Sequence, residues 1–440
     1  EFVMVFDRVC EEARVENTTA AATAPITGAS AGGSGVFTAC LAGLRRSALR
    51  CAGAIAVSGL LAGCMGSSMG TAPDGLQSLP ATPSVPTVTG ETIGTGTVRV
   101  GLLLPLSAGG SASAIAATFR NSAELAIRDF QGSDIQLLVK DTAGTAEGGR
   151  AAAQSAISEG AELILGPVFA PAVSGAAGVA RSSGVPIVAF STDTSVAGPG
   201  VYLLSFLPAG DVKRIISYAA TQNRRSYIAL LPDDAYGAVA EAAFRQEVGR
   251  TGGRVVSIQR YKVSGSDTSD LAAKTQALVS ALPQADALFL PAANVAPFVM
   301  QSLMTQGSNL ANVKVLGSGQ WDAAQVTSNP IMAGTWFPGP ERSGFDALSG
   351  RYQATFGSAP ARNASLAYDG TILAAGLVRS AGPQRFSQPV LTNRDGFLGI
   401  DGVFRFLVNG ESERGLAVYE IAPGGMKVIS PAPRDFRAAS

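Results

Sequence analysis

A strand, a loop of small residues and a helix follow one another between Val98 and Phe130, and this unit limits the folds open to the chain. The first residues, VRVGLLL, form an apolar run typical of a strand buried on both faces of a parallel sheet. Gly109 and Gly110 interrupt that pattern, and from Ile115 onward the apolar residues recur with the helical period. The unit predicts an α/β protein whose ligand loops follow the carboxyl ends of parallel strands.

The alternation of strands and helices continues far beyond this first unit. A first series reaches the hydroxyl-rich loop FSTDTS at 190–195, and a second series begins near Val201, where Asp211 is expected to cap a helix. The chain has 440 residues, which is too long for one hydrophobic core. We therefore expect two doubly wound parallel-sheet lobes, with the chain returning between them through a hinge before a final hairpin at 402–429.

Composition excludes several classes of function. Lysine plus arginine and aspartate plus glutamate each total 33, so the net charge is +0 and no field favours nucleic acid. The chain contains no histidine, which removes histidine-based catalytic triads and histidine-based zinc sites. No cysteine follows Cys64, so the folded part has no disulfide. We expect no enzymatic activity, no cofactor and no metal.

The segment 44–63 has the features of a signal peptide. Arg45, Arg46 and Arg50 precede an apolar core that is shorter than the roughly 18 residues a spanning helix needs. The segment ends in LAGC, which resembles the lipobox of bacterial lipoproteins and makes Cys64 the expected lipidation site. A transmembrane anchor or an accidental LAGC is the alternative.

The regions on either side of this segment are expected to lack a packed core. Residues 1–43 show no hydrophobic period and are interpreted as disordered or as sequence upstream of the true start. Residues 64–97 are mostly Gly, Ser, Thr and Pro, and they predict a lipidated cysteine followed by a flexible tether.

The order of several motifs resembles the type I periplasmic binding proteins, the superfamily of the branched-chain amino acid receptors with the leucine-binding domain. The motifs are VRVGLLLPLSAGG, ILGPVFAPAVSGAAGVARSSGVPIVAFST, LPDDAYGAVAEAAFRQEVGRTGGRVV, LGSGQW and AYDGTILAAGLV. The resemblance implies two lobes joined by three hinge crossovers. It assigns 98–208 and 337–397 to the first lobe, 209–336 and 398–430 to the second, and 431–440 to a tail.

The resemblance implies a non-enzymatic substrate-binding lipoprotein that closes on a small polar, amino-acid-like ligand for an ABC importer. The partner is then an ABC permease, with no nucleic acid involved. The lipobox, the tether and LLLPLS also resemble lipoprotein activators of penicillin-binding proteins, in which the same fold docks a protein and the cleft is vestigial. Both imply the periplasmic space of a Gram-negative-type bacterium. Met65 after the cysteine favours the outer membrane over the inner one.

The resemblance also implies a ligand site. Hydroxyls and backbone N–H groups after the third and fourth strands would hold a carboxylate, and an acidic residue of the second lobe would hold an ammonium. The matching positions are Ser107, Val168, Phe169, Ala170, Ser191, Thr192, Thr194, Tyr236, Asn294, Gln320 and Trp321.

Several of these positions keep an alternative. A solvated turn explains the hydroxyls at 191–194 equally well, and Asp193 among them would repel a carboxylate. Trp321 either lines the cleft or plugs it. The family acid falls near Gln320, where the nearest carboxylate is Asp322, and Asp369 is interpreted as a structural brace.

Overall fold

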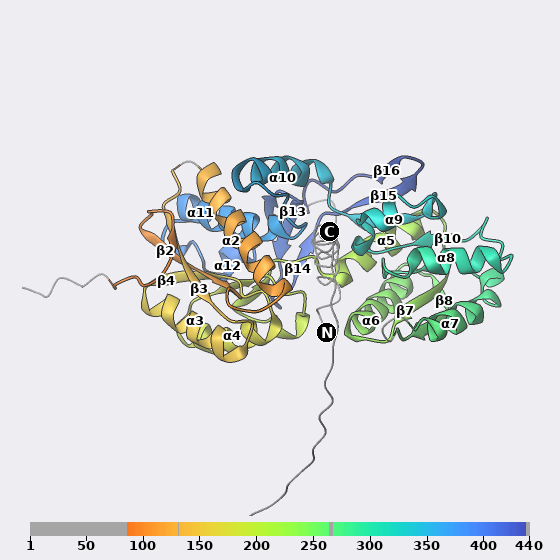
Figure 1. Cartoon of the computed structure of the whole chain (residues 1–440), viewed down its shortest axis with the longest axis horizontal. Coiled ribbons are helices and arrows are strands. Elements are labelled where there is room, and N and C mark those ends of the chain that lie inside the picture. Colours follow the sequence, from red (N-terminus) through yellow and green to blue (C-terminus); the bar gives the residue numbers. More distant parts are fainter. Residues whose placement is uncertain (1–85, 131, 264–266, 437–440) are drawn as a thin grey trace, which may run out of the picture. The chain divides into compact units, whose positions relative to one another are not determined.

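The computed structural model describes residues 86–130, 132–263 and 267–436 (Figure 1). The predicted signal peptide, the lipidation site Cys64 and the residues before 86 lie outside this part of the chain. Within the described residues, none of the helices combines the length and apolarity that crossing a membrane requires.

The first sheet is built around the apolar run that opens the folded part. Its six strands have the order β1-β3-β2-β4-β5-β6, and β2 pairs in parallel with β3 and β4. The predicted 98–104 strand is confirmed to the residue. The strands are β1 (Thr92–Ile93), β2 (Val98–Leu104), β3 (Ile135–Asp141), β4 (Ala161–Leu165), β5 (Ile187–Ala189) and β6 (Val201–Leu203).

Helices cover both faces of this sheet (Figure 1). On one face, α2 (Ser111–Asp129) and α11 (Ala364–Ser380) pack over the sheet in a core that contains Phe119 and Leu373. On the other face, α3 (Ala146–Ser158) and α4 (Ala170–Ser182) pack through alanines, which lets the two helices approach closely.

The second sheet has seven strands in the order β16-β15-β11-β10-β9-β7-β8. Its core is again double: α5 (Pro208–Thr221) and α6 (Ala235–Arg250) contribute to one cluster, and α7 (Ser269–Val279) and α8 (Ala296–Thr305) contribute to the other. The strands are β7 (Ser226–Pro232), β8 (Arg254–Tyr261), β9 (Ala287–Phe289), β10 (Lys314–Leu316), β11 (Trp336–Gly339), β15 (Ala417–Ala422) and β16 (Gly425–Ser430).

A three-stranded sheet, three further α-helices and five short 3-10 helices complete the described part. The order of the small sheet is β12-β13-β14. The elements are α9 (Ala324–Thr327), α10 (Arg342–Phe356), α12 (Gln388–Leu391), β12 (Phe397–Gly399), β13 (Gly402–Phe406) and β14 (Ser412–Arg414), with short 3-10 helices at η1 (Thr194–Val196), η2 (Leu282–Gln284), η3 (Gly319–Trp321), η4 (Pro330–Met332) and η5 (Gly382–Gln384).

The α/β class with parallel-strand sheets is confirmed, but the expected chain boundaries need correction. Phe337 was assigned to the first lobe, yet β11 pairs with β10 and β15 and so belongs to the second sheet. Residues 398–406 were assigned to the second lobe, yet Phe404 and Phe406 pack into the core of the first sheet. The predicted single hairpin at 402–429 is therefore two antiparallel units, β13–β14 and β15–β16, in different sheets.

The first lobe consists of the first sheet, the small sheet and the helices α2–α4 and α10–α12. The second lobe consists of the second sheet and the helices α5–α9. The chain passes between these lobes at 204–207, at 340–341 and at 415–416.

The expected tether to residue 97 is also too long, because Thr92–Ile93 already pairs with β3. Just before it, Thr89 donates its hydroxyl to Glu159 at 2.6 Å and accepts a bond from Lys140 at its carbonyl at 2.7 Å. Lys140 and Glu159 form a buried ion pair at 2.7 Å. The polar composition of 86–97 concealed these contacts because they depend on partners far along the chain.

The helix cap predicted at Asp211 is wrong, because Asp211 lies inside the first turn of α5. The helix begins at Pro208, and proline suits this position because its φ is already helical and it has no N–H that needs a partner. Asp234 is the side chain that caps α6, accepting the Gly237 N–H at 2.7 Å.

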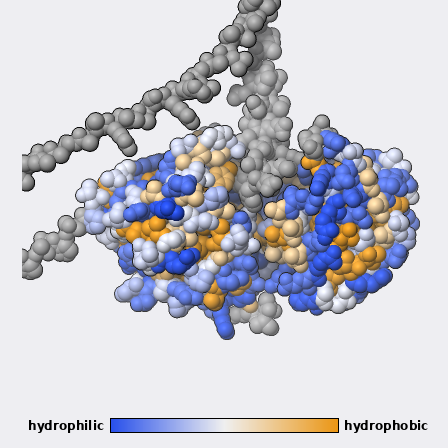
Figure 2. All heavy atoms as spheres, turned by 90° about the horizontal axis from the view of Figure 1, so that it is seen from below, coloured by the Kyte–Doolittle hydropathy of each residue, from blue (hydrophilic) through white to orange (hydrophobic). Residues whose placement is uncertain are grey.

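Hydrophobic and hydrophilic residues are interspersed on the molecular face drawn in Figure 2. Most large apolar side chains of the described residues are buried in the sheet cores. Those that are exposed lie scattered over both lobes: Leu106, Val239, Phe298, Met304, Leu398, Val408 and Val428.

We expect Glu159→Gln to lower the free energy of unfolding at pH 7 by about 3 to 5 kcal/mol, because it leaves Lys140 buried without a counter-charge. Burial alone would raise the pKa of Glu159, but the bonds from Lys140, Thr89 and Ser155 prevail and lower it from 4.5 to about 2. The carboxylate therefore stabilises the fold above pH 4.5, and that contribution is lost as the pH falls towards about 2.

Urea unfolding of both proteins at pH 7 and at pH 3 checks this expectation. The control is Arg128→Gln, which removes an exposed partner of Glu124 and should change stability by less than about 1 kcal/mol. Equal stability of Glu159→Gln and the parent at pH 7 would contradict it.

Candidate functional site

The first wall of the candidate site consists of loops at the carboxyl ends of β2 and β4. Ser107 follows β2, is exposed, and donates its backbone N–H to Asp141 at 3.2 Å. Val168, Phe169 and Ala170 lead from β4 into α4, whose first turn has no side-chain cap. These three side chains offer no hydroxyl, so only backbone N–H groups of this helix start are available to an anion.

The loop after β5 brings hydroxyls next to that helix start, since the Phe190 N–H donates to the Pro167 carbonyl at 3.0 Å. Ser191 is buried, and its Oγ accepts the Asp193 N–H at 3.1 Å. Asp193 in turn accepts the Ser195 N–H at 2.9 Å, and Thr194 begins the 3-10 turn η1. The local turn that was the alternative therefore exists.

Thr192 differs from its neighbours in this loop. Its Oγ1 is buried and has no hydrogen-bond partner among the residues that the structure describes. A buried hydroxyl without a partner costs about 1 to 3 kcal/mol, so a ligand that accepts a bond there would relieve a real penalty. The Thr192 hydroxyl is therefore not committed to the local turn.

The second wall contains Tyr236, which lies in the first turn of α6. Its hydroxyl donates to Ser318 Oγ at 3.1 Å, and Ser318 donates to the Pro291 carbonyl at 2.8 Å. This relay fixes the ring against the ends of β9 and β10. Burial raises the pKa of Tyr236, so the phenol stays neutral and able to donate. Sequence reasoning placed Tyr236 but missed Ser318.

Asp211 reaches the same short turn from α5. Its Oδ2 accepts the Gly319 N–H at 2.9 Å. No lysine or arginine within the described ranges forms an ion pair with this carboxylate. Burial raises the pKa of Asp211 to about 7. The bond from the Gly319 N–H lowers the pKa, but by less than burial raises it. The sequence suggested a helix cap here; Pro208, three residues earlier, was the signal that the helix starts before Asp211.

The remaining predicted residues of the second wall, Gln320, Asn294 and Trp321, differ in how far their side chains are exposed to solvent. Gln320 is half-buried in η3, and Asn294 is exposed in the turn after β9. Trp321 is fully buried in the core beside Phe337, with ring centroids 6.5 Å apart. Its Nε1 has no hydrogen-bond partner among the described residues. A Cβ on Gly317 would lie 2.1 Å from the indole, so only glycine fits beneath it.

Asp322 does not replace the family acid expected near Gln320. Its carboxylate pairs with Arg342 at 2.7 Å and lies 3.9 Å from Arg362. Both of its oxygens therefore already face cations, which leaves Asp211 as the acid beside this turn without one.

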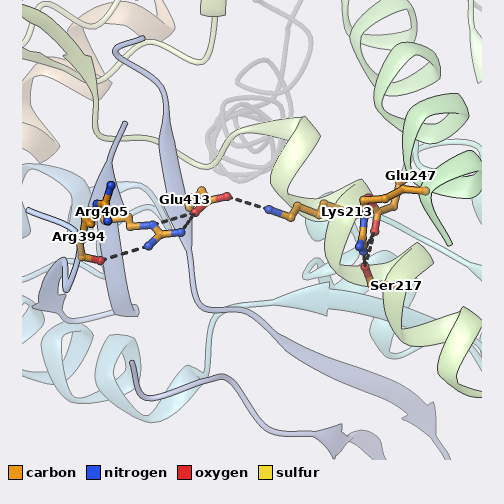
Figure 3. A network of polar contacts seen from close by, with 7 residues as sticks. Lys213, Ser217, Glu247, Arg394, Arg405 and Glu413 are labelled. Atoms are coloured by element: carbon orange, nitrogen blue, oxygen red, sulfur yellow. Dashed lines mark hydrogen bonds and ion pairs between the residues drawn. The ribbon is translucent and has the colours of Figure 1, made fainter. Parts of the chain in front are cut away.

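Ion pairs join the two lobes close to the crossovers. Glu413 of β14 binds Lys213 of α5 at 2.7 Å and Arg405 of β13 at 2.6 Å (Figure 3). These two cations outweigh burial and lower the pKa of Glu413. Arg414 donates to the Ser205 carbonyl at 3.1 Å, which links the third crossover to the first.

The chain belongs to the periplasmic binding protein family, whose model matches residues 97–419. No curated protein matches the chain. Solved structures share the fold at low identity. A putative branched-chain amino acid ABC transporter protein from Rhodospirillum rubrum has a TM-score of 0.66 and 19% identity, covering 76% of this chain and 99% of that one.

Two further structures have bound molecules in their descriptions. An ABC transporter substrate-binding protein from Desulfitobacterium hafniense, in complex with Leu, has a TM-score of 0.56 and 18% identity, covering 76% of this chain and 99% of that one. A solute-binding protein from Rhodopseudomonas palustris BisB5, in complex with 3,4-dihydroxybenzoic acid, has a TM-score of 0.53 and 20% identity, covering 76% and 98%.

We expect Trp321→Ala to lower the free energy of unfolding by about 3 to 5 kcal/mol, because it empties a fully buried position. Gln320→Ala, at the adjacent half-buried position, should change it by about 0.5 kcal/mol or less. Denaturant unfolding of the two variants separates a core residue from a residue of the site wall. A Trp321→Ala protein as stable as the parent would contradict the core assignment.

Proposed function

We propose that this chain is a non-enzymatic, lipid-anchored substrate-binding protein that closes on a small amino-acid-like ligand and delivers it to an ABC permease. The observation that carries the proposal is a pair of complementary features on the two walls. The first wall offers the free Thr192 hydroxyl beside the start of α4, and the second offers the Asp211 carboxylate without a cation.

These features suit a zwitterion. A ligand carboxylate would accept bonds from Thr192, Ser191, Thr194 and the backbone N–H groups of α4. A ligand ammonium would lie against Asp211, with the Tyr236 ring beside the ligand side chain. Because a buried charge needs compensation, the two ligand charges and the two walls would satisfy one another on closure.

The same features favour amino acids over aromatic acids. The Desulfitobacterium protein is described with Leu, whereas the Rhodopseudomonas protein is described with a benzoic acid, which has no ammonium. A benzoate bound here would place no cation against Asp211 and would gain nothing from that carboxylate. The carboxylate at 211 therefore supports the amino acid class.

A second candidate function is activation of a penicillin-binding protein with a vestigial cleft. The observation in its favour is the loop 168–170, where apolar side chains replace the hydroxyl that a carboxylate site would use. In this case the substitutions below would leave function unchanged, and the protein would bind a purified synthase without any small ligand.

We expect Thr192→Ala and Asp211→Asn each to weaken leucine binding about tenfold to a hundredfold, because each removes a charge-assisted hydrogen bond. The matched controls are Ser195→Ala in the same loop and Asp233→Asn near α6, both exposed, which should bind as the parent does. Isothermal titration with leucine and with 3,4-dihydroxybenzoate measures the effects.

The pH dependence tests Asp211 separately. An ammonium binds the ionised carboxylate, so leucine affinity should fall as the pH drops below about 7 in the parent and stay flat in Asp211→Asn.

The raised pKa of Asp211 also affects the stability of the protein without ligand. The free energy of unfolding should decline as the pH rises from 3.8 to about 7, and Asp211→Asn should lack that decline. Full leucine affinity in Asp211→Asn would refute the ammonium role, and a flat response to every amino acid would favour the activator.

The anchoring part of the proposal depends on Cys64, which lies outside the described residues. We expect Cys64→Ala to give a protein that is unprocessed or released from the membrane, because the sulfur that receives the lipid is gone. Mass spectrometry of membrane-extracted protein checks this. An unmodified Cys64, or a retained 44–63 segment in the parent protein, would contradict lipidation.

A further inference from the structure

A groove on the first lobe lies between α11 and the segment from α12 to β13, apart from the strand-end loops of the candidate site. Its volume is about 590 Å³, within the range of small-molecule sites. Apolar side chains form most of its lining, among them Phe130, Leu373, Leu377, Phe397, Leu398 and Phe404.

Two features of the neighbouring elements leave this groove open. The helix α12 has only four residues and ends at Leu391, so it covers little of α11. Gly376 lies on the α11 face that lines the groove, and a Cβ placed there would meet no atom within 4 Å. Leu398 is 78% exposed at the groove, an unusual position for a large apolar side chain.

The groove has one free acceptor at a buried position. Asp369 lines it, is 3% exposed, and uses Oδ1 to accept the Ile400 N–H at 2.8 Å. Its Oδ2 has no hydrogen-bond partner within the described part of the chain. The expected brace at Asp369 therefore exists, but it occupies only one of the two carboxylate oxygens.

The charges around Asp369 determine what this oxygen can accept. Arg362 pairs with Asp401 at 2.6 Å. The positive charge of buried Arg414 acts on Asp369 without a direct hydrogen bond. Burial raises the pKa of Asp369 to about 7, so the acids of this cluster do not exceed its two arginines in charge, and an added ammonium would bring an uncompensated positive charge. A neutral donor, such as a hydroxyl, satisfies Oδ2 without adding a charge.

We propose that this groove binds a small, largely apolar molecule that carries a hydroxyl at one end, with the hydroxyl donating to Asp369 Oδ2. The site is separate from the proposed amino acid site, and it takes a different chemical class. The apolar body of the molecule would cover Leu377, Phe397 and Leu398, and the open space over Gly376 would hold part of it.

The test titrates 4-propylphenol into the full chain by isothermal calorimetry. We expect saturable binding at one site. The methyl ether 4-propylanisole, which has no donor, should bind at least tenfold more weakly. The ammonium of 3-phenylpropylamine should also bind more weakly than the phenol.

Gly376→Phe fills the groove and should abolish phenol binding while the protein remains folded. Its matched control is Gly350→Phe, another helical glycine with open space that does not line the groove, which should bind the phenol as the parent does. Asp369→Asn should lose the preference for phenol over ether. Because that variant also touches the Ile400 bond, Gly376→Phe keeps the test decisive if Asp369→Asn fails to fold.

Equal affinity for the phenol and its ether would overturn the role of Asp369, and tighter binding of the ammonium would overturn the neutral-donor class. Absence of phenol binding, or binding that Gly376→Phe leaves intact, would overturn the site itself.

Discussion

The core of the first lobe is completed by residues from the last part of the chain, and the two lobes depend on this return. Phe404 and Phe406 pack beneath the first sheet, where Phe406 lies 5.5 Å from the ring of Tyr202. From β13 the chain continues through β14 to β15, which joins the second sheet. Neither sheet can complete its core unless the chain has crossed between them. The crossovers follow from this constraint. The ion pairs of Glu413 with Lys213 and of Asp322 with Arg362 join the two lobes.

Local patterns predicted the parts of the fold whose structure is locally determined. The strand at 98–104 and the helix α2 after it follow from an apolar run and a helical period. The errors occur where long-range pairing decides. Thr92–Ile93 is too short to show a pattern, and Phe337 looks the same whichever sheet it joins. The hairpin at 402–429 was misassigned for the same reason, because its two halves pair with different sheets.

The candidate site shows the same division. Strand-end loops and the tyrosine at the start of α6 were accessible to sequence reasoning, because the carboxyl ends of strands are positioned by the fold class. Ser318 and Asp211 were not, since their role arises only when α5, α6 and β10 bring them to one turn. Trp321 was left open between two roles, and the structure adds that its side chain is completely buried in the core. Whether a side chain faces a ligand or a core is a property of packing that one sequence does not contain.

The contacts of Thr89 have a mechanical consequence. Tension applied to the chain at Pro86 is resisted at once by the Pro86 carbonyl, which accepts a bond from Arg99 of β2 at 2.9 Å. Thr89 comes next, and its hydroxyl and carbonyl are held by Glu159 and Lys140. Glu91 follows, with its carbonyl bonded to Val139 and its carboxylate to Arg120. Load would therefore spread into β3, α2 and α3 before it reached the hydrogen bonds of β1. A pull from this side therefore acts first on the first lobe, because all of these partners belong to it.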